Sequence, residues 1–193
     1  MPNLYIISGC NGAGKTTASF TILPEMLDCK EFVNADEIAK GLSPFQPESV
    51  SFQAGRIMIE RIEELLNSGV DFAFETTLTT LSYLNTIRVA KEKGYSVTLL
   101  YFWLNDVDLA IERVKTRVIE GGHNIPEETI RRRYFRGAYN LTNKFAVLCD
   151  YWIVINNSSR PFIFVAEGQG ATELRVYDEM LWQQIKTQSN EKE

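Results

Sequence analysis

The opening stretch of the chain carries residues whose types and spacing fit phosphate chemistry. Residues 9–16 read GCNGAGKT, which matches the pattern G-x-x-x-x-G-K-[ST] at every position. In such a loop the backbone N–H groups point at phosphate oxygens, Lys15 would reach the β- and γ-phosphates, and the Thr16 hydroxyl would ligate Mg²⁺. The pattern therefore predicts a site for a nucleoside triphosphate and Mg²⁺ built from Gly9, Asn11, Gly12, Ala13, Gly14, Lys15, Thr16 and Thr17.

Two acidic residues further along each follow a short apolar segment. Asp36 lies two residues after Asn34, and Glu75 is followed by Thr76. Chemistry in α/β proteins is placed at the carboxyl ends of strands, and phosphoryl transfer needs a carboxylate near the accepting hydroxyl. Asp36 is a candidate base, and an equally supported alternative is that it caps a helix. Glu75 would hold Mg²⁺ through water or bind substrate with Asn34 and Thr76; the alternative is a solvated loop residue.

Basic residues gather on both sides of Gly121-Gly122: Arg113, Lys115, Arg117, Arg131, Arg132, Arg133 and Arg136. Two helices joined by this loop, about residues 113–136, predict an arginine lid over phosphates, because the guanidinium fork pairs with phosphate oxygens. Arg117 and Arg133 are the candidate catalytic arginines, and Arg132 is a candidate substrate contact. The alternative is a solvated face paired with glutamates. His123, the only histidine, fits a structural role better than a catalytic one.

Apolar periodicity predicts the elements that would position these residues. Strand patterns occupy residues 4–7, 70–74, 95–104 and 151–155, and helical patterns occupy 17–23, 48–67, 81–93, 106–120 and 126–148. The nearly continuous apolar run 95–104 is typical of a parallel strand covered on both faces. Segments 162–166 and 172–177 predict a β-hairpin before a last helix, within residues 161–187. We expect one α/β P-loop NTPase domain over residues 1–193, with a mostly parallel central sheet flanked by helices.

Composition narrows the class of protein. The 193 residues are 45% hydrophobic and 23% charged, as in an ordinary globular domain. A net charge of −5 disfavours a nucleic-acid partner. No apolar run approaches the ~20 residues of a membrane span, the N-terminus does not resemble a signal peptide, and the three cysteines lack metal-ligand spacing. We therefore expect a cytoplasmic protein without membrane association.

Four segments in this order resemble zeta-toxin-type P-loop kinases: GCNGAGKTT, VNADEIA, FAFETTL and RVKTRVIEGGHNIPEETIRRRY. The resemblance implies ATP-dependent phosphoryl transfer to a hydroxyl of a small molecule, which in the toxins is the sugar of a UDP-N-acetyl amino sugar. It places the family's catalytic base at Asp36 and its substrate-pocket glutamate at Glu75. The family's lid arginines fall within residues 113–133.

The chain departs from the toxin pattern in two places. Toxins carry an arginine shortly after the strand-end glutamate, where this chain has Leu78-Thr79-Thr80, and an acid on the preceding helix that only Glu60 approximates. Since the first strand begins almost at Met1, we expect any antitoxin to be a separate chain. Two other functions remain open, an ATP-binding regulatory module without turnover and a nucleic-acid-linked ATPase that uses the arginines as a groove.

Overall fold

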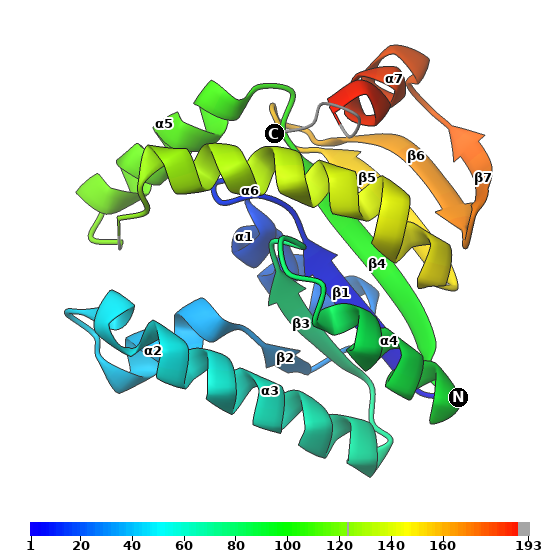
Figure 1. Cartoon of the computed structure of the whole chain (residues 1–193), viewed down its shortest axis with the longest axis horizontal. Helices are drawn as coiled ribbons and strands as arrows, with labels where there is room; N and C mark the ends of the chain where they lie inside the picture. The colour runs from blue at the N-terminus through cyan, green and yellow to red at the C-terminus, as the bar shows by residue number, and fades with distance from the viewer. Residues whose placement is uncertain (123, 189–193) are drawn as a thin grey trace.

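A seven-stranded sheet forms the centre of the molecule (Figure 1). The coordinates are a computed structural model that describes residues 1–122 and 124–188. The strand order is β2-β3-β1-β4-β5-β6-β7. Five strands are parallel, namely β1 (Asn3–Ser8), β2 (Glu31–Val33), β3 (Phe72–Thr76), β4 (Ser96–Trp103) and β5 (Tyr151–Asn156). The last two, β6 (Ile163–Gln169) and β7 (Thr172–Val176), are antiparallel.

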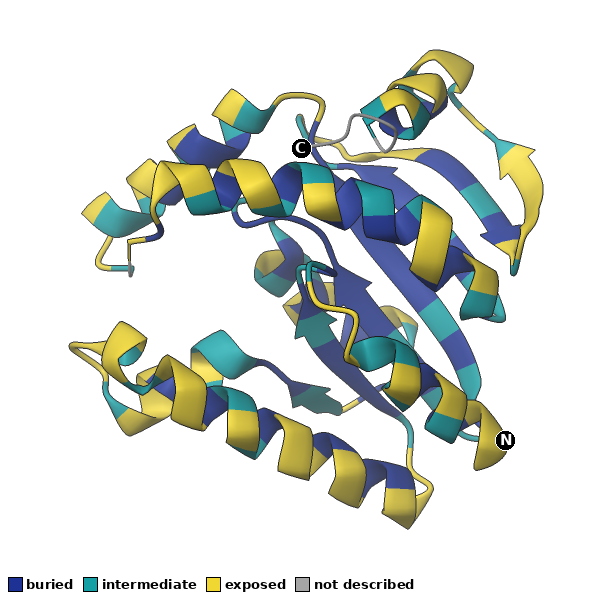
Figure 2. Cartoon of the chain, in the orientation of Figure 1, coloured by how far each residue is buried: buried dark blue, intermediate teal, exposed yellow. Residues whose placement is uncertain are grey.

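Helices cover both faces of this sheet, and the strands between them are largely buried (Figure 2). One core cluster joins the sheet to α3 (Ser51–Ser68), α4 (Tyr83–Glu92) and α7 (Glu179–Gln188). The other joins it to α1 (Lys15–Thr21), α5 (Val107–Ile119) and the first half of α6 (Glu127–Asn140). Helix α2 (Ala35–Leu42) lies beside α3 near the β2 end of the sheet.

The structure confirms the predicted fold class, and the predicted hairpin is the β6–β7 pair, which extends the sheet beyond β5. Some element ends differ from the prediction. Helix α1 begins at Lys15, and Pro24 lies in a π-helical turn, Ile22–Met26, that continues it. Strand β3 includes Glu75 and Thr76, because both residues still pair with β1. The apolar pattern of the sequence does not detect these two residues as part of the strand. Their side chains are polar, but their backbones still form the hydrogen bonds of the sheet.

The remaining irregular turns extend the helices. A 3₁₀ turn, Pro47–Val50, precedes α3, and a π turn, Leu141–Phe145, and a 3₁₀ turn, Ala146–Leu148, follow α6. Among the described residues, no helix combines the length and the hydropathy needed to cross a membrane. The structural role predicted for His123 lies outside the described residues.

Candidate active site

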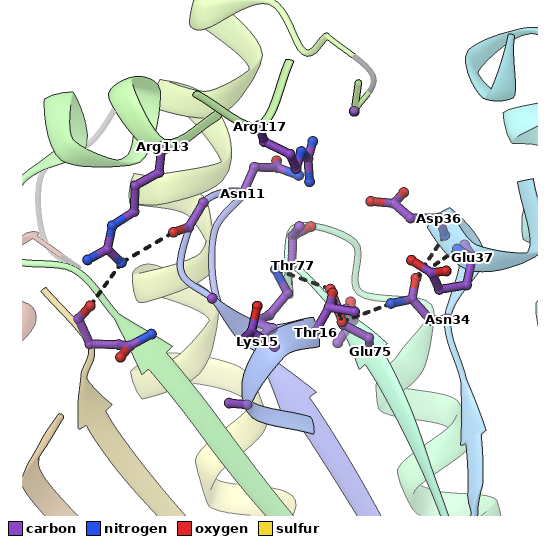
Figure 3. A pocket seen from close by; sticks show the side chains of 18 of the residues that line it. Asn11, Lys15, Thr16, Asn34, Asp36, Glu37, Glu75, Thr77, Arg113 and Arg117 are labelled. Carbon is purple, nitrogen blue, oxygen red and sulfur yellow. Dashed lines mark hydrogen bonds and ion pairs between the residues drawn. The ribbon is translucent and has the colours of Figure 1, made fainter. Parts of the chain in front are cut away.

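A cavity of about 1360 Å³ opens where the carboxyl ends of β1 and β3 meet the start of α2 and the helices α5 and α6 (Figure 3). It brings together most of the predicted residues: Asn11, Gly12, Gly14, Lys15, Thr16, Thr17, Asn34, Asp36, Glu75, Thr76, Arg117 and Arg133. Gly9 and Ala13 belong to the loop but are not among the described residues that line the cavity. Arg132 is exposed and is not among them either.

The loop between β1 and α1 is held against α5 and the end of β5. At Gly12, with φ +79°, a Cβ atom would lie 2.6 Å from the Ala110 carbonyl oxygen, so α5 packs too closely for any side chain there. Arg113 donates hydrogen bonds of 2.9 Å to the carbonyl oxygens of Asn157 and Ser158. Arg113 lines the cavity, but its guanidinium is engaged in holding backbone in place.

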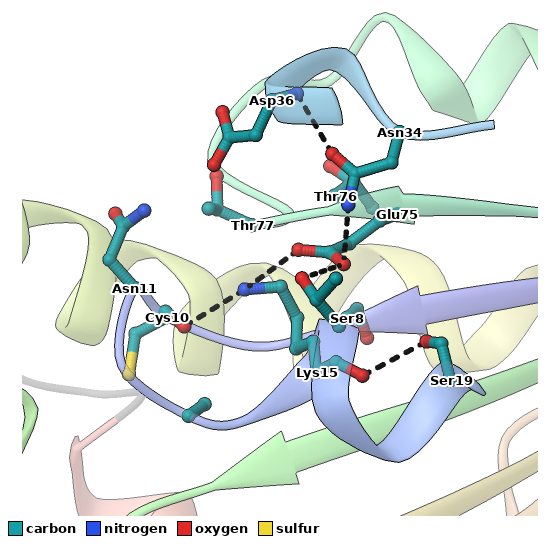
Figure 4. A network of polar contacts seen from close by, with 12 residues as sticks. Ser8, Cys10, Asn11, Lys15, Ser19, Asn34, Asp36, Glu75, Thr76 and Thr77 are labelled. Atoms are coloured by element: carbon teal, nitrogen blue, oxygen red, sulfur yellow. Dashed lines mark hydrogen bonds and ion pairs between the residues drawn. The ribbon is translucent and has the colours of Figure 1, made fainter. Parts of the chain in front are cut away.

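Glu75 connects the loop to the rest of the cavity (Figure 4). Its carboxylate lies 3.4 Å from Lys15 Nζ, and it accepts hydrogen bonds from Thr16 Oγ1 at 2.8 Å and Asn34 Nδ2 at 2.9 Å. The Lys15 and Glu75 side chains are only 6% and 11% exposed, so this ion pair is shielded from water. Lys15 Nζ also donates to the Cys10 carbonyl oxygen at 3.0 Å. The carboxylate therefore orients the two loop side chains that the motif assigns to phosphate and metal.

Asn34, rather than Asp36, caps α2. Its Oδ1 atom accepts hydrogen bonds from the backbone N–H groups of Asp36 at 2.8 Å and Glu37 at 3.4 Å, and its own backbone is extended. The capping alternative for Asp36 is thereby wrong. Asp36 instead occupies the first turn of α2, and its side chain lines the cavity opposite Arg117 (Figure 3).

The arginines of α5 and α6 divide between the cavity and the surface. Arg133 donates to Asn11 Oδ1 at 2.9 Å. Burial lowers the pKa of Arg133, and the negative charge of Asp36 partly offsets this effect. Other basic residues form exposed ion pairs, Arg131 with Asp108 and Lys115 with Glu127, so the solvated-face alternative describes these two.

The residues at and after the end of β3 form the threonine turn, residues 76–80, of which we predicted only Thr76 as a site residue. Leu78 has φ +56°, an uncommon value for a branched residue, and its side chain is fully buried. The turn is fixed from both sides, because Leu78 N–H donates to Thr76 Oγ1 at 3.1 Å and Asn140 Nδ2 donates to the Leu78 carbonyl oxygen at 2.6 Å. Thr77, Thr79 and Thr80 line the cavity. Four threonines within five residues at a strand end were the available sequence signal.

A second missed group follows β5. Asn157, Arg160 and Phe162 line the cavity on the side of Arg113. The Asn157 side chain donates to the Ala13 carbonyl oxygen at 2.8 Å, which joins this segment to the loop. The polar run that closes the predicted strand, Asn156-Asn157-Ser158, was the signal that could have identified it.

Comparison with known proteins relates this site to one family. The zeta toxin family model matches residues 1–168. An uncharacterized protein of Haemophilus influenzae is 34% identical over 128 residues, which cover 65% of this chain and 88% of that protein. The fold resembles the AvrRxo1-ORF1:-ORF2 complex crystallised with ATP (TM-score 0.74, 17% identity), covering 99% of this chain and 65% of that one.

A second similar structure comes from the PezAT chromosomal toxin-antitoxin system of Streptococcus pneumoniae. It has a TM-score of 0.64 and 17% identity, and it covers 98% of this chain and 86% of that chain. At such identities the structural likeness establishes the shared P-loop kinase fold. The family assignment rests on the match over residues 1–168. The chain therefore belongs to the zeta toxin family of P-loop kinase-type phosphotransferases.

Proposed function

We propose that this protein transfers the γ-phosphoryl group of ATP to a hydroxyl group of a small molecule. The observation that carries the proposal is the position of Asp36, whose side chain shares one cavity with the phosphate-binding loop. Asn34 caps α2, so the Asp36 carboxylate is not used as the helix cap, and Asp36 lines the cavity. A carboxylate in this position can accept the proton of an attacking hydroxyl.

Several other residues that line the cavity would have a role in this reaction. The loop N–H groups and Lys15 bind the β- and γ-phosphates, and Arg133 and Arg117 offset the negative charge that spreads over the transferred group. The ion pair with Glu75 keeps Lys15 in place. Glu75 also accepts a hydrogen bond from Asn34, on the side of the cavity where the acceptor would bind. Phosphoryl transfer has a loose transition state, so most of the acceleration comes from positioning and electrostatics.

The side-chain oxygen atoms at the phosphate-binding loop suit Mg²⁺ as ligands. Thr16 Oγ1 and the Glu75 carboxylate lie 2.8 Å apart, and both are the hard oxygen ligands that this ion prefers. Thr16 would ligate the ion directly and Glu75 through water. When bound, Mg²⁺ neutralises phosphate charge and favours an in-line geometry.

The family resemblance offers one acceptor, a UDP-N-acetyl amino sugar, and one macromolecular partner, a separate antitoxin-like protein. The AvrRxo1-ORF1:-ORF2 complex contains two different proteins, and PezAT is a toxin-antitoxin system, which supports testing for such a partner here. This chain has Leu78-Thr79-Thr80 where the toxins carry an arginine. We therefore treat the nucleotide sugar as one of several candidate acceptors and not as the assumed one.

The experiment measures ADP release from ATP and Mg²⁺ with a panel of sugars, nucleosides and UDP-sugars, and mass spectrometry of the products. We expect at least one acceptor to stimulate ADP release and to gain one phosphoryl group. An Asp36→Asn variant should bind ATP normally and lose transfer. Tight ATP binding with no stimulation by any acceptor would instead support a regulatory binding module. Nucleic-acid binding that weakens steeply with salt would support the nucleic-acid-linked ATPase.

A further inference from the structure

The two oxygen atoms of the Glu75 carboxylate divide their contacts between the phosphate-binding loop and Asn34 (Figure 4). Oε1 lies 3.4 Å from Lys15 Nζ, and Oε2 accepts hydrogen bonds from Thr16 Oγ1 at 2.8 Å and from Asn34 Nδ2 at 2.9 Å. The motif assigns Lys15 to the β- and γ-phosphates and Thr16 to the metal ion. A carboxylate therefore stands beside the ammonium group on which the binding of the terminal phosphates depends.

This carboxylate is fixed in place. The backbone of Glu75 pairs with Ile7 in the ladder between β3 and β1, and β1 is the strand that leads into the loop. The Glu75 side chain is only 11% exposed, and each of its oxygen atoms has a partner. Turning it away from the loop would break these contacts and leave a shielded charge unpaired, which is costly. We therefore expect the carboxylate to stay at the loop when phosphates bind there.

The charge of Glu75 acts in opposite directions on the two forms of ATP. The Lys15–Glu75 pair is shielded from water, so charges near it are weakly screened. A triphosphate without metal that reaches Lys15 also approaches the Glu75 carboxylate, and like charges at short range repel. With a divalent cation held by Thr16 and Glu75, the same carboxylate becomes a ligand and favours binding.

The arginines at the cavity do not produce this difference. Arg113 donates hydrogen bonds to backbone carbonyl oxygens, and Arg133 donates to the amide oxygen of Asn11. Both guanidinium groups keep their positive charge, and they attract the phosphates whether or not a metal ion accompanies them. They therefore raise the affinity for both forms of ATP, and the distinction between the forms depends on Glu75.

We infer that Glu75 makes the binding of ATP conditional on a divalent cation. One carboxylate repels the metal-free triphosphate and contributes a ligand to the metal-bound one. The inference rests on the proposed use of the loop for ATP and Mg²⁺, and it goes beyond that proposal. A carboxylate that only ligated Mg²⁺ would add affinity for the metal-bound form and leave the affinity for metal-free ATP unchanged.

The test is calorimetry with a non-hydrolysable ATP analogue, in Mg²⁺ and in EDTA, on the native chain and two variants. Glu75→Gln removes the charge and keeps the side-chain length and one acceptor oxygen. Glu37→Gln is the matched control, because Glu37 lines the same cavity but pairs with Lys40 at 2.6 Å on the surface, where both side chains are nearly half exposed.

We expect Glu75→Gln to bind the analogue in EDTA at least ~10-fold more tightly than the native chain does, and to bind it in Mg²⁺ no more tightly. Glu37→Gln should change both Kd values by less than about 3-fold, because an exposed pair contributes little. Unchanged or weaker binding by Glu75→Gln in EDTA overturns the inference. An equal gain in both variants also overturns it, since the effect would then come from the net charge of the cavity.

The native chain supplies a measurement that needs no variant. The γ-phosphate adds negative charge near Lys15 and Glu75, so the gain in affinity from ADP to the ATP analogue should be at least ~10-fold larger in Mg²⁺ than in EDTA. Equal gains in the two conditions overturn this inference and leave the proposed phosphotransfer to the product assay. Binding of the analogue in neither condition overturns the proposed phosphotransfer as well.

Discussion

Replacement of Asn34 tests how the candidate base is held over the phosphate-binding loop. One side-chain amide makes two kinds of contact, because Oδ1 caps α2 at the N–H groups of Asp36 and Glu37 while Nδ2 donates to Glu75 at 2.9 Å. Asn34 is buried, with 5% of its surface exposed. It therefore connects the helix that carries Asp36 to the carboxylate that orients the loop.

Two substitutions separate the contacts. Asn34→Ser keeps a good capping oxygen but cannot reach Glu75, and the loss of a hydrogen bond to a charged group costs about 1.5–3 kcal/mol. Asn34→Ala also loses the cap, which adds about 1 kcal/mol. Urea unfolding should rank the free energies of unfolding as native, then Asn34→Ser, then Asn34→Ala. Displacement of α2 should also lower kcat on the order of 10²-fold in both variants, because the base is misplaced.

A double-mutant cycle supplies the control. In a Glu75→Ala background the contact is already absent, so Asn34→Ser should cost little beyond its effect on packing. If Asn34→Ser destabilises the chain equally in both backgrounds, the Glu75 contact contributes nothing and this account of how α2 is positioned is incorrect. Native kcat in Asn34→Ser would refute the link to Asp36 even if stability fell.

Three further predictions concern the base, the threonine turn and the thiols. Asp36→Asn should lower kcat by about 10²–10⁴-fold at unchanged ATP affinity, measured by ADP release and by titration with an ATP analogue; a parallel loss of ATP affinity would argue against a role as base. Gly137→Ala places a Cβ atom 2.8 Å from the Thr77 carbonyl oxygen, so it should destabilise the chain by about 1–3 kcal/mol and raise the acceptor KM while the ATP KM stays constant. Burial raises the pKa of Cys10 to about 11, above its ordinary value, so the thiol stays protonated at pH 8. Alkylation of the native chain at pH 8 should be at least ~10²-fold slower than in urea, since Cys29 and Cys149 are buried as well; rapid native labelling at Cys10 would contradict this assignment.

Local patterns in the sequence determined the phosphate-binding loop and the class of fold. The motif at residues 9–16 is contiguous, and its geometry depends on neighbouring backbone, so spacing alone indicates its chemistry. The apolar run of residues 95–104 likewise indicated a central strand, because a strand covered on both faces has no polar side to satisfy. The acid at residue 75 was correctly placed at the end of a strand.

Contacts between distant segments decided what each polar residue does. By sequence, Asp36 could either cap a helix or face the site. In the structure the Asn34 side chain caps the helix instead, and it also hydrogen-bonds Glu75, which lies 41 residues further along the chain. Arg113 and Arg133 cannot be distinguished by residue type. In the structure Arg113 hydrogen-bonds the backbone after β5, and Arg133 hydrogen-bonds Asn11 at the cavity. The left-handed Leu78 of the threonine turn is stabilised by burial and by Asn140, 62 residues away. Such roles depend on long-range packing, which composition and spacing along the chain do not encode locally.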